Sequence, residues 1–254
     1  MFQSIIERIL KGIKYVRVFI DDIMVFAPTK HQHDATLREV IQRLEEYGIT
    51  INLKKCEFGK PEVTFMGHVL SEKGIKPTLD KVEAIRRLRE PCTVEEVRSF
   101  LGTITYLGRF IPDLSTLTTP LRQLLRKDSK FVWGSPQKEA FQKIKDILVD
   151  PKSLGYYSPC DKTILIADAS STGLGGVLLQ EKDGVKRVIC YISKGLSDAE
   201  KSYAQNEKEA LALVWATERL QIYLRGMEFL LLTDHEPLKV IFGPGHPSCP
   251  RIER

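Results

Sequence analysis

The chain has 254 residues, of which 43% are hydrophobic and 28% charged, which is typical of a globular protein with two or three small domains. No apolar run approaches the roughly 18 to 20 residues of a membrane-spanning helix, and the N-terminus lacks a signal peptide, so we expect a soluble, intracellular protein with no membrane partner. The net charge of +5 permits a polyanionic partner without indicating one.

The cysteine pattern predicts reduced thiols. The five cysteines are odd in number, lie far apart and form no Cys-x-x-Cys pair: Cys56, Cys92, Cys160, Cys190 and Cys249. Neither a disulfide framework nor a zinc site is therefore indicated.

Near the N-terminus, two adjacent acids lie between two β-type apolar runs. Asp21 and Asp22 separate residues 15–20 from residues 23–26, which predicts a hairpin with paired carboxylates at its bend. Two crowded like charges favour a bound cation, and oxygen-only ligands suit Mg²⁺ held together with substrate phosphates. The alternative is a solvated turn, because Asp is common in turns. The residues alone leave both interpretations open.

The next segment predicts a helix followed by short strands. Apolar residues recur at helical spacing over residues 31–47, and Gly48 is placed to cap that helix in the left-handed conformation. Residues 49–51 and 63–66 are expected to be strands. Gly67 interrupts the second strand, either as a simple bend or as a point of close approach by a ligand.

From about Leu79 the pattern becomes helical. One amphipathic helix runs from Leu79 and is closed by Pro91, and a second begins after Thr93, with Glu96 completing a capping box. A short element follows over residues 117–125, and a fourth helix begins at residues 135–136. Basic side chains are interspersed with acids on this unit, as on an ordinary solvated surface.

A segment rich in turn formers, residues 150–159, precedes a third region. Apolar strands are predicted at residues 163–167, 176–179, 187–192 and 229–233, with a long helix at residues 206–224 before the last strand. Asp168 and Asp234 directly follow the first and last of these strands, where open α/β sheets bind ligands. The glycines at 173–176 do not form a phosphate loop, because a strand follows them.

Helical geometry selects one acid on the long helix. At about 100 degrees per residue, Glu209 shares a stripe with Leu213 and Ala216, whereas Glu207 is turned well away. We therefore expect Glu209 to face the sheet. Apolar residues also lie on the opposite side of the helix. The alternative that this side packs on other parts of the protein therefore stays open.

Several ordered motifs resemble the polyprotein of gypsy-type long-terminal-repeat retrotransposons. Residues 19–22, Phe-Ile-Asp-Asp, are similar to the Tyr-Ile-Asp-Asp box of reverse transcriptases. Further matches are residues 48–49, 53–58, 65–71, 100–102, 109–111, 119–121, 167–170 and 233–235. The resemblance covers nearly the whole chain.

The resemblance implies an α+β / α/β fold in three parts. These are the C-terminal portion of a polymerase palm at residues 1–78, a helical thumb or connection at 79–150, and a C-terminally truncated ribonuclease H-like mixed sheet with helices at 151–254. Asp21 and Asp22 would be catalytic metal ligands, and Phe65, Met66, Gly67 and His68 would grip the primer strand. The implied partners are an RNA template, a DNA primer, RNA:DNA hybrid and, in the complete enzyme, deoxynucleotides. A dimer is left open, as is the choice between a cytoplasmic particle and the nucleus.

Asp168, Glu209 and Asp234 would then form a triad of hard oxygen ligands for catalysis. They suit two Mg²⁺ or Mn²⁺ ions roughly 3.5 to 4 Å apart, which would cleave the RNA strand of an RNA:DNA hybrid. The residues present do not include the family's third palm aspartate, its fingers or its fourth nuclease acid. Two hypotheses therefore stand: part of an RNA-directed DNA polymerase with ribonuclease H activity, or an incomplete or co-opted fragment that only binds nucleic acid or a polymerase subunit.

Overall fold

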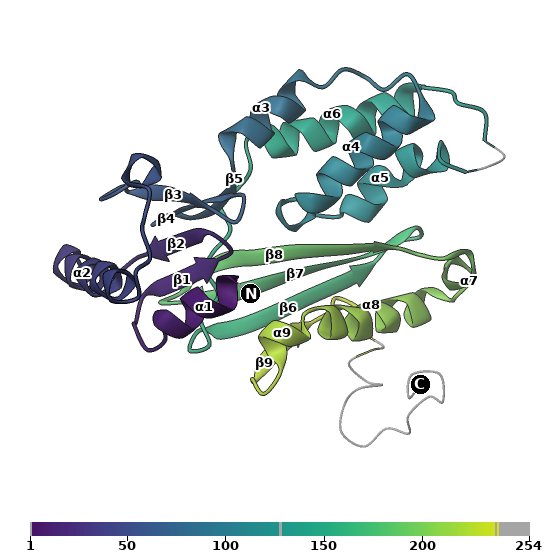
Figure 1. The fold of residues 1–254 in the computed structure, drawn as a ribbon. Coiled ribbons are helices and arrows are strands. Elements are labelled where there is room, and N and C mark those ends of the chain that lie inside the picture. Colours follow the sequence, from purple (N-terminus) through teal and green to yellow (C-terminus); the bar gives the residue numbers. More distant parts are fainter. Residues whose placement is uncertain (1, 127–128, 237, 239–254) are drawn as a thin grey trace. The chain divides into compact units, whose positions relative to one another are not determined.

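The computed structural model describes residues 2–126, 129–236 and 238, and the chain divides into two compact units, Met1–Glu72 and Lys73–Arg254. Both units combine helices with β-sheet (Figure 1), which confirms the predicted mixed α and β fold. The finer division at residues 78/79 and 150/151 stays a prediction. In the described part of the chain, no helix is both long and apolar enough to cross a membrane.

The first unit packs two helices against a hairpin. Its elements are α1 (Phe2–Ile9), β1 (Val16–Phe19), β2 (Asp22–Val25), α2 (Lys30–Glu46), the 3₁₀ turn η1 (Leu53–Lys55), β3 (Glu62–Phe65) and β4 (His68–Ser71). Buried apolar residues of α1, β1 and α2 form its core, among them Ile6, Val16 and Leu44. This core gives the carboxylate hairpin a rigid support.

Helix α2 ends as predicted, but the strand expected after it is absent. Thr29 caps the start of α2, and Gly48 follows its end with a φ of +66°. Residues 49–51 are irregular, so the predicted strand there is wrong. The reason is that the Ile49 amide donates to the carbonyl of Leu44 at 2.8 Å, which closes the helix and uses a donor that a strand ladder would need.

The second unit begins with β5 (Gly74–Pro77) and a group of helices. These are α3 (Leu79–Arg87), α4 (Val94–Tyr106), the 3₁₀ turn η2 (Gly108–Phe110), α5 (Leu114–Gln123) and α6 (Ser135–Val149). The four predicted helices are confirmed, with α5 beginning earlier than expected. Thr93 caps α4 as predicted, accepting from the Glu96 amide, but the Glu96 carboxylate accepts from the amide of Cys92. The predicted capping box is thus displaced by one residue.

A four-stranded sheet completes the second unit. Its elements are β6 (Lys162–Ala169), β7 (Gly173–Lys182), β8 (Val185–Gly195), α7 (Asp198–Lys201), α8 (Gln205–Arg219), α9 (Gln221–Leu224) and β9 (Phe229–Leu232). The strand order is β8-β7-β6-β9, with β9 parallel to β6 and the other pairs antiparallel. All four predicted strands are confirmed, whereas the predicted single helix is interrupted at Leu220.

Helices lie on both faces of this sheet, while the edge strand β9 stays largely exposed. Helix α8 packs on one face, over Leu165, Leu174 and Leu178, and α5 with its neighbouring helices lies on the other (Figure 1). Gln180 of β7 holds the segment that leads into β6. Its side-chain amide is fully buried and forms hydrogen bonds with the backbone N–H and C=O of Ser158 and with the Thr163 hydroxyl. These contacts hold the start of β6, the strand that carries Asp168 near its other end.

Candidate active site

The structure brings two of the predicted nuclease acids together. Asp168 lies near the end of β6, and Glu209 lies on the inner face of α8 with only 5% of its surface exposed. The backbone amide of Ala169 donates to Asp168 Oδ1 at 2.8 Å and to Glu209 Oε2 at 3.2 Å. The two carboxylates therefore converge on one N–H group.

The predicted orientation of Glu209 toward the sheet is confirmed, whereas Glu207 caps the N-terminus of α8. The Glu207 carboxylate accepts from the amide of Ala204 at 3.1 Å and so caps the start of α8. An acid that caps a helix terminus satisfies a donor that would otherwise lack a partner. The helical stripe thus separated an acid that faces the sheet from one that faces the helix end.

Gln205 is a site residue that the sequence reasoning missed. Its side-chain amide donates to Glu209 Oε1 at 2.6 Å and to the carbonyl of Ala169 at 3.0 Å. It therefore links the helix carboxylate to the backbone of β6. The available signal was its position four residues before Glu209, which places the two side chains on the same helix face.

The electrostatics of the pair favour a bound cation. Burial raises the pKa of Glu209, and the negative charge of Asp168 raises it further, while the hydrogen bonds from Gln205 and Ala169 act in the opposite direction. Two carboxylates this close are costly when both are ionised without a positive partner. A proton or a metal ion between them removes that cost.

Asp234 is placed at the neighbouring strand end. Ile166 of β6 pairs with Leu232 of β9 in parallel register, so Asp168 and Asp234 each follow two residues later. Asp234 is exposed, and over residues 2–126, 129–236 and 238 no group of three or more His, Cys, Asp or Glu side chains is arranged to hold a metal ion. The structure thus brings Asp168 and Glu209 together, and Asp234 follows the end of the adjacent strand β9.

The carboxylate hairpin of the first unit has the predicted form. Phe19 pairs with Asp22, which leaves Ile20 and Asp21 as a two-residue loop, and both acids are exposed. Ile20 has a φ of +53°, a conformation in which a β-branched residue is strained. Such strain occurs frequently at functional sites.

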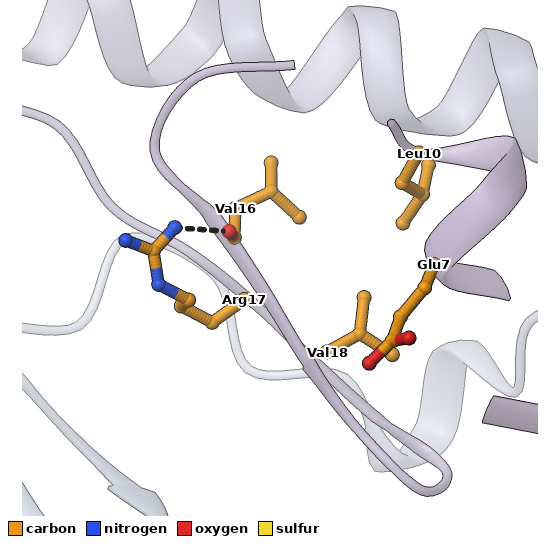
Figure 2. Close-up of a pocket in the computed structure, with 5 residues that line it drawn as sticks. All are labelled: Glu7, Leu10, Val16, Arg17 and Val18. Carbon is orange, nitrogen blue, oxygen red and sulfur yellow. Dashed lines mark hydrogen bonds between the residues drawn. The ribbon is translucent and has the colours of Figure 1, made fainter. Parts of the chain in front are cut away.

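A pocket of about 220 Å³ lies beside this hairpin, between α1 and β1. Its lining residues are Glu7, Leu10, Val16, Arg17 and Val18 (Figure 2). The Arg17 guanidinium donates to the carbonyl of Val16 at 2.8 Å, and the Glu7 carboxylate lies near Val18. Neither hairpin acid lines this pocket, so it does not extend the carboxylate site.

The predicted primer-strand segment is a second tight hairpin. Phe65 pairs with His68, and the loop residues Met66 and Gly67 have φ values of +50° and +73°. Two positive φ values in a two-residue loop are typical of a type I′ turn, for which glycine is favoured. The Phe65 ring contacts the Phe19 ring edge to face, with centroids 6.4 Å apart. This contact joins the segment to the carboxylate hairpin, while its nucleic-acid role stays a prediction.

Comparison with known families assigns both ends of the chain. Residues 1–70 match the family described as reverse transcriptase (RNA-dependent DNA polymerase), and residues 158–254 match the RNase H-like domain found in reverse transcriptase. The Tf2-3 and Tf2-4 transposon polyproteins of Schizosaccharomyces pombe are each 35% identical over 242 residues, which is 93% of this chain. The chain spans 18% of the length of these relatives.

Solved structures show the same fold. The foamy viral protease-reverse transcriptase dRH in complex with double-stranded DNA has a TM-score of 0.83 at 22% identity, over 99% of this chain and 45% of that one. The foamy viral protease-reverse transcriptase in complex with RNA/DNA hybrid has a TM-score of 0.79 at 22% identity, over 98% and 35% of the two chains. The resemblance drawn from the sequence motifs is thus confirmed: the chain belongs with the polyproteins of gypsy-type retrotransposons and carries a reverse transcriptase segment followed by an RNase H-like domain.

Proposed function

We propose that the chain is part of an RNA-directed DNA polymerase with ribonuclease H activity, and that its RNase H-like domain cleaves the RNA strand of RNA:DNA hybrids. The observation that carries this proposal is the convergence of Asp168 and the buried Glu209 on the Ala169 amide. A buried acid held against a second acid at the end of a strand is poorly suited to a purely structural role, because it destabilises the pair unless a cation joins it.

The donor set fits a divalent metal ion. Reverse transcriptase and RNase H families generally use divalent metals, and carboxylate oxygens are the ligands that Mg²⁺ and Mn²⁺ prefer. Asp168 and Glu209 would hold the metal, with Asp234 contributing from the adjacent strand end. When bound, two such ions supply water activation and stabilisation of the leaving oxygen.

The chain's own residues would keep this centre in shape. Gln205 holds the Glu209 carboxylate from one side and the β6 backbone from the other, which limits the rotamers of the acid. The Ala169 amide keeps both carboxylates pointing to the same place. An ion that binds there meets ligands that are already oriented.

For the polymerase half, we propose that Asp21 and Asp22 bind metal together with deoxynucleotide phosphates, completed by groups outside this chain. Their place at the strained tip of a hairpin supports this role. Primer contact by Phe65, Met66, Gly67 and His68 is part of the same proposal, as are an RNA template and a DNA primer as partners. The similar foamy viral structures are complexes with double-stranded DNA and with RNA/DNA hybrid. Cellular location and dimerisation stay predictions.

The test is hybrid cleavage by the pair of variants Glu209→Gln and Glu207→Gln. A labelled RNA:DNA hybrid is incubated with each protein in Mg²⁺ or Mn²⁺, and RNA fragments are measured. We expect Glu209→Gln to lose at least about 100-fold in rate, as for loss of a metal ligand, and Glu207→Gln to keep most of it. Equal activity in both variants would contradict the proposal.

A second candidate function is hybrid binding without cleavage. It is favoured by the absence of a three-acid cluster from the described part of the chain. Binding through backbone phosphates would weaken steeply with salt and would survive Asp168→Asn. Salt-sensitive binding with no product in either metal would select this function.

A further inference from the structure

The first turn of α5 lies directly against the hairpin that carries Asp168. Asp168 on β6 pairs with Gly175 on β7, and Gly175 pairs with Ser193 on β8, so the three residues form one row across the sheet. The backbone amide of Ser115, in the first turn of α5, donates to the Ser193 hydroxyl at 2.6 Å. The turn comprising residues 113–116 therefore rests on the row that contains the candidate metal ligand.

Two glycines permit this close approach. A Cβ atom at Gly175 would lie 2.7 Å from Asp113 Oδ1. A Cβ atom at Gly173 would overlap the Ser115 side chain and lie 3.0 Å from the carbonyl oxygen of Lys194. Real side chains avoid such distances, so the glycines are needed for α5 to lie this close to the hairpin.

One side chain of the turn reaches the loop that follows Asp168. The Thr116 hydroxyl lies 3.2 Å from the Ser170 hydroxyl. Two other threonines of the same helix, Thr118 and Thr119, bond instead to backbone carbonyls of α5. Thr116 therefore connects α5 to the hairpin, whereas the Thr118 and Thr119 hydroxyls form hydrogen bonds within α5.

Ser170 organises the hairpin loop. Its hydroxyl accepts from the amides of Gly173 at 2.9 Å and Thr172 at 3.3 Å, and it donates to the Gly173 carbonyl at 3.0 Å. Either hydroxyl could be the donor in its contact with Thr116 at 3.2 Å, so this contact joins the two hydroxyls without a fixed direction. Ser170 follows Asp168 by two residues, and Ala169 between them supplies the amide shared with Glu209.

We propose that Thr116 is a positioning residue for RNA cleavage. Through Ser170 it holds the loop after β6, and thereby keeps Asp168 and the Ala169 amide in place against Glu209. The inference rests on the proposed function, and it adds that the helical part of the second unit helps to set the geometry of the nuclease centre.

The test compares Thr116→Val, Ser170→Ala and the double variant in the full 254-residue chain. Thr103→Val is the matched control, because Thr103 is exposed on α4 and its hydroxyl bonds to its own helix. Amide exchange of residues 168–176 is measured first, without metal. We expect exchange to be about threefold to tenfold faster in Thr116→Val and unchanged in the control, in line with the loss of one hydrogen bond.

Two further quantities are measured. The first is the Mn²⁺ concentration at half-saturation (the Mn²⁺ midpoint), determined by titration calorimetry, and the second is the rate of hybrid cleavage. Thr116→Val is expected to raise the Mn²⁺ midpoint and lower kcat by about threefold to tenfold, with KM for hybrid unchanged. If Thr116 acts through Ser170, the double variant will be no worse than Ser170→Ala alone. The inference would be overturned if the effects of Thr116→Val and Ser170→Ala multiplied in the double variant. It would also be overturned if amide exchange in Thr116→Val equalled that of the wild type. A wild-type chain that cleaves no hybrid counts against the proposed function, whereas exchange and Mn²⁺ binding still decide the positioning role.

Discussion

Asp168 and Glu209 accept hydrogen bonds from the same backbone amide, that of Ala169, at 2.8 and 3.2 Å. These acids are 41 positions apart in the sequence, one on β6 and one on α8, and the fold places them on one N–H group. Because burial and the neighbouring charge oppose ionisation of Glu209, the pair is a source of instability until a cation binds. Under the proposed function, the stability of the protein and its binding of a metal ion would therefore be linked at this site.

The first prediction concerns the stability of the metal-free protein. The pKa of Glu209 is raised in the folded state, so its contribution to stability is present below the unfolded pKa and is lost as pH rises through the folded pKa. In EDTA at pH 8, Glu209→Gln should therefore melt above wild type, by about 2 °C. At pH 4 the difference should shrink.

Thermal melts followed by circular dichroism check this, with and without Mg²⁺. Added Mg²⁺ should raise the wild-type Tm and leave that of Glu209→Gln unchanged, because the variant lacks one ligand. A Glu209→Gln protein that melts below wild type in EDTA at pH 8 would show that the charge is not a cost.

The second prediction concerns Glu200, whose pKa is lowered to about 2, chiefly by its hydrogen bond with Lys194 and by the Ser197 amide. A depressed pKa adds stability above the unfolded value, and this stability is lost as pH falls toward the folded pKa. Glu200→Gln should lower the Tm at pH 7 by a few degrees, and less at pH 4. Glu139→Gln, an exposed acid on α6, is the control and should match wild type at both values.

The third prediction concerns the fully buried Gln180. Gln180→Met keeps the side-chain volume but leaves the Ser158 amide and carbonyl without their partner. Buried polar groups without partners are costly, so the free energy of unfolding should fall by about 2 to 3 kcal/mol. Urea titration measures it, with the exposed Gln142→Met as the control. A loss equal to that of the control would mean that water replaces the Gln180 amide at no cost.

The fourth prediction concerns the strained loop residue Ile20, with its φ of +53°. Glycine adopts this conformation without strain, so Ile20→Gly should stabilise the first unit by up to about 1 kcal/mol. Ile20→Ala retains a Cβ and should not produce this gain. Urea unfolding distinguishes the two variants, and equal stabilities would show that the positive φ carries no strain.

Local patterns in the sequence predicted the elements and several site residues. Helical spacing separated Glu209 from Glu207, and apolar runs located the strand that contains Asp168 near its end and the strand that ends before Asp234. Periodicity reports which face of an element is apolar, and this is a local property. It therefore identified Glu209 as the acid that faces the sheet, and it located the strand ends beside Asp168 and Asp234.

Contacts that depend on tertiary packing could not be predicted in this way. The Thr116 and Ser170 hydroxyls are 54 positions apart, and no periodicity relates them. Residues 49–51 have a strand-like composition, but their first amide is used by the end of α2. Leu220 interrupts a helix whose apolar pattern continues past it. In each case packing or a competing hydrogen bond outweighs local preference.

The most direct test of the central claim is the cleavage of a labelled RNA:DNA hybrid by the wild-type chain and by Asp168→Asn, in Mg²⁺ and in EDTA. We predict RNA fragments from the wild type in Mg²⁺, no fragments in EDTA, and a loss of at least about 100-fold in Asp168→Asn with hybrid binding retained. Cleavage by Asp168→Asn at the wild-type rate, or cleavage by the wild type in EDTA, would contradict a metal-dependent centre built on Asp168 and Glu209.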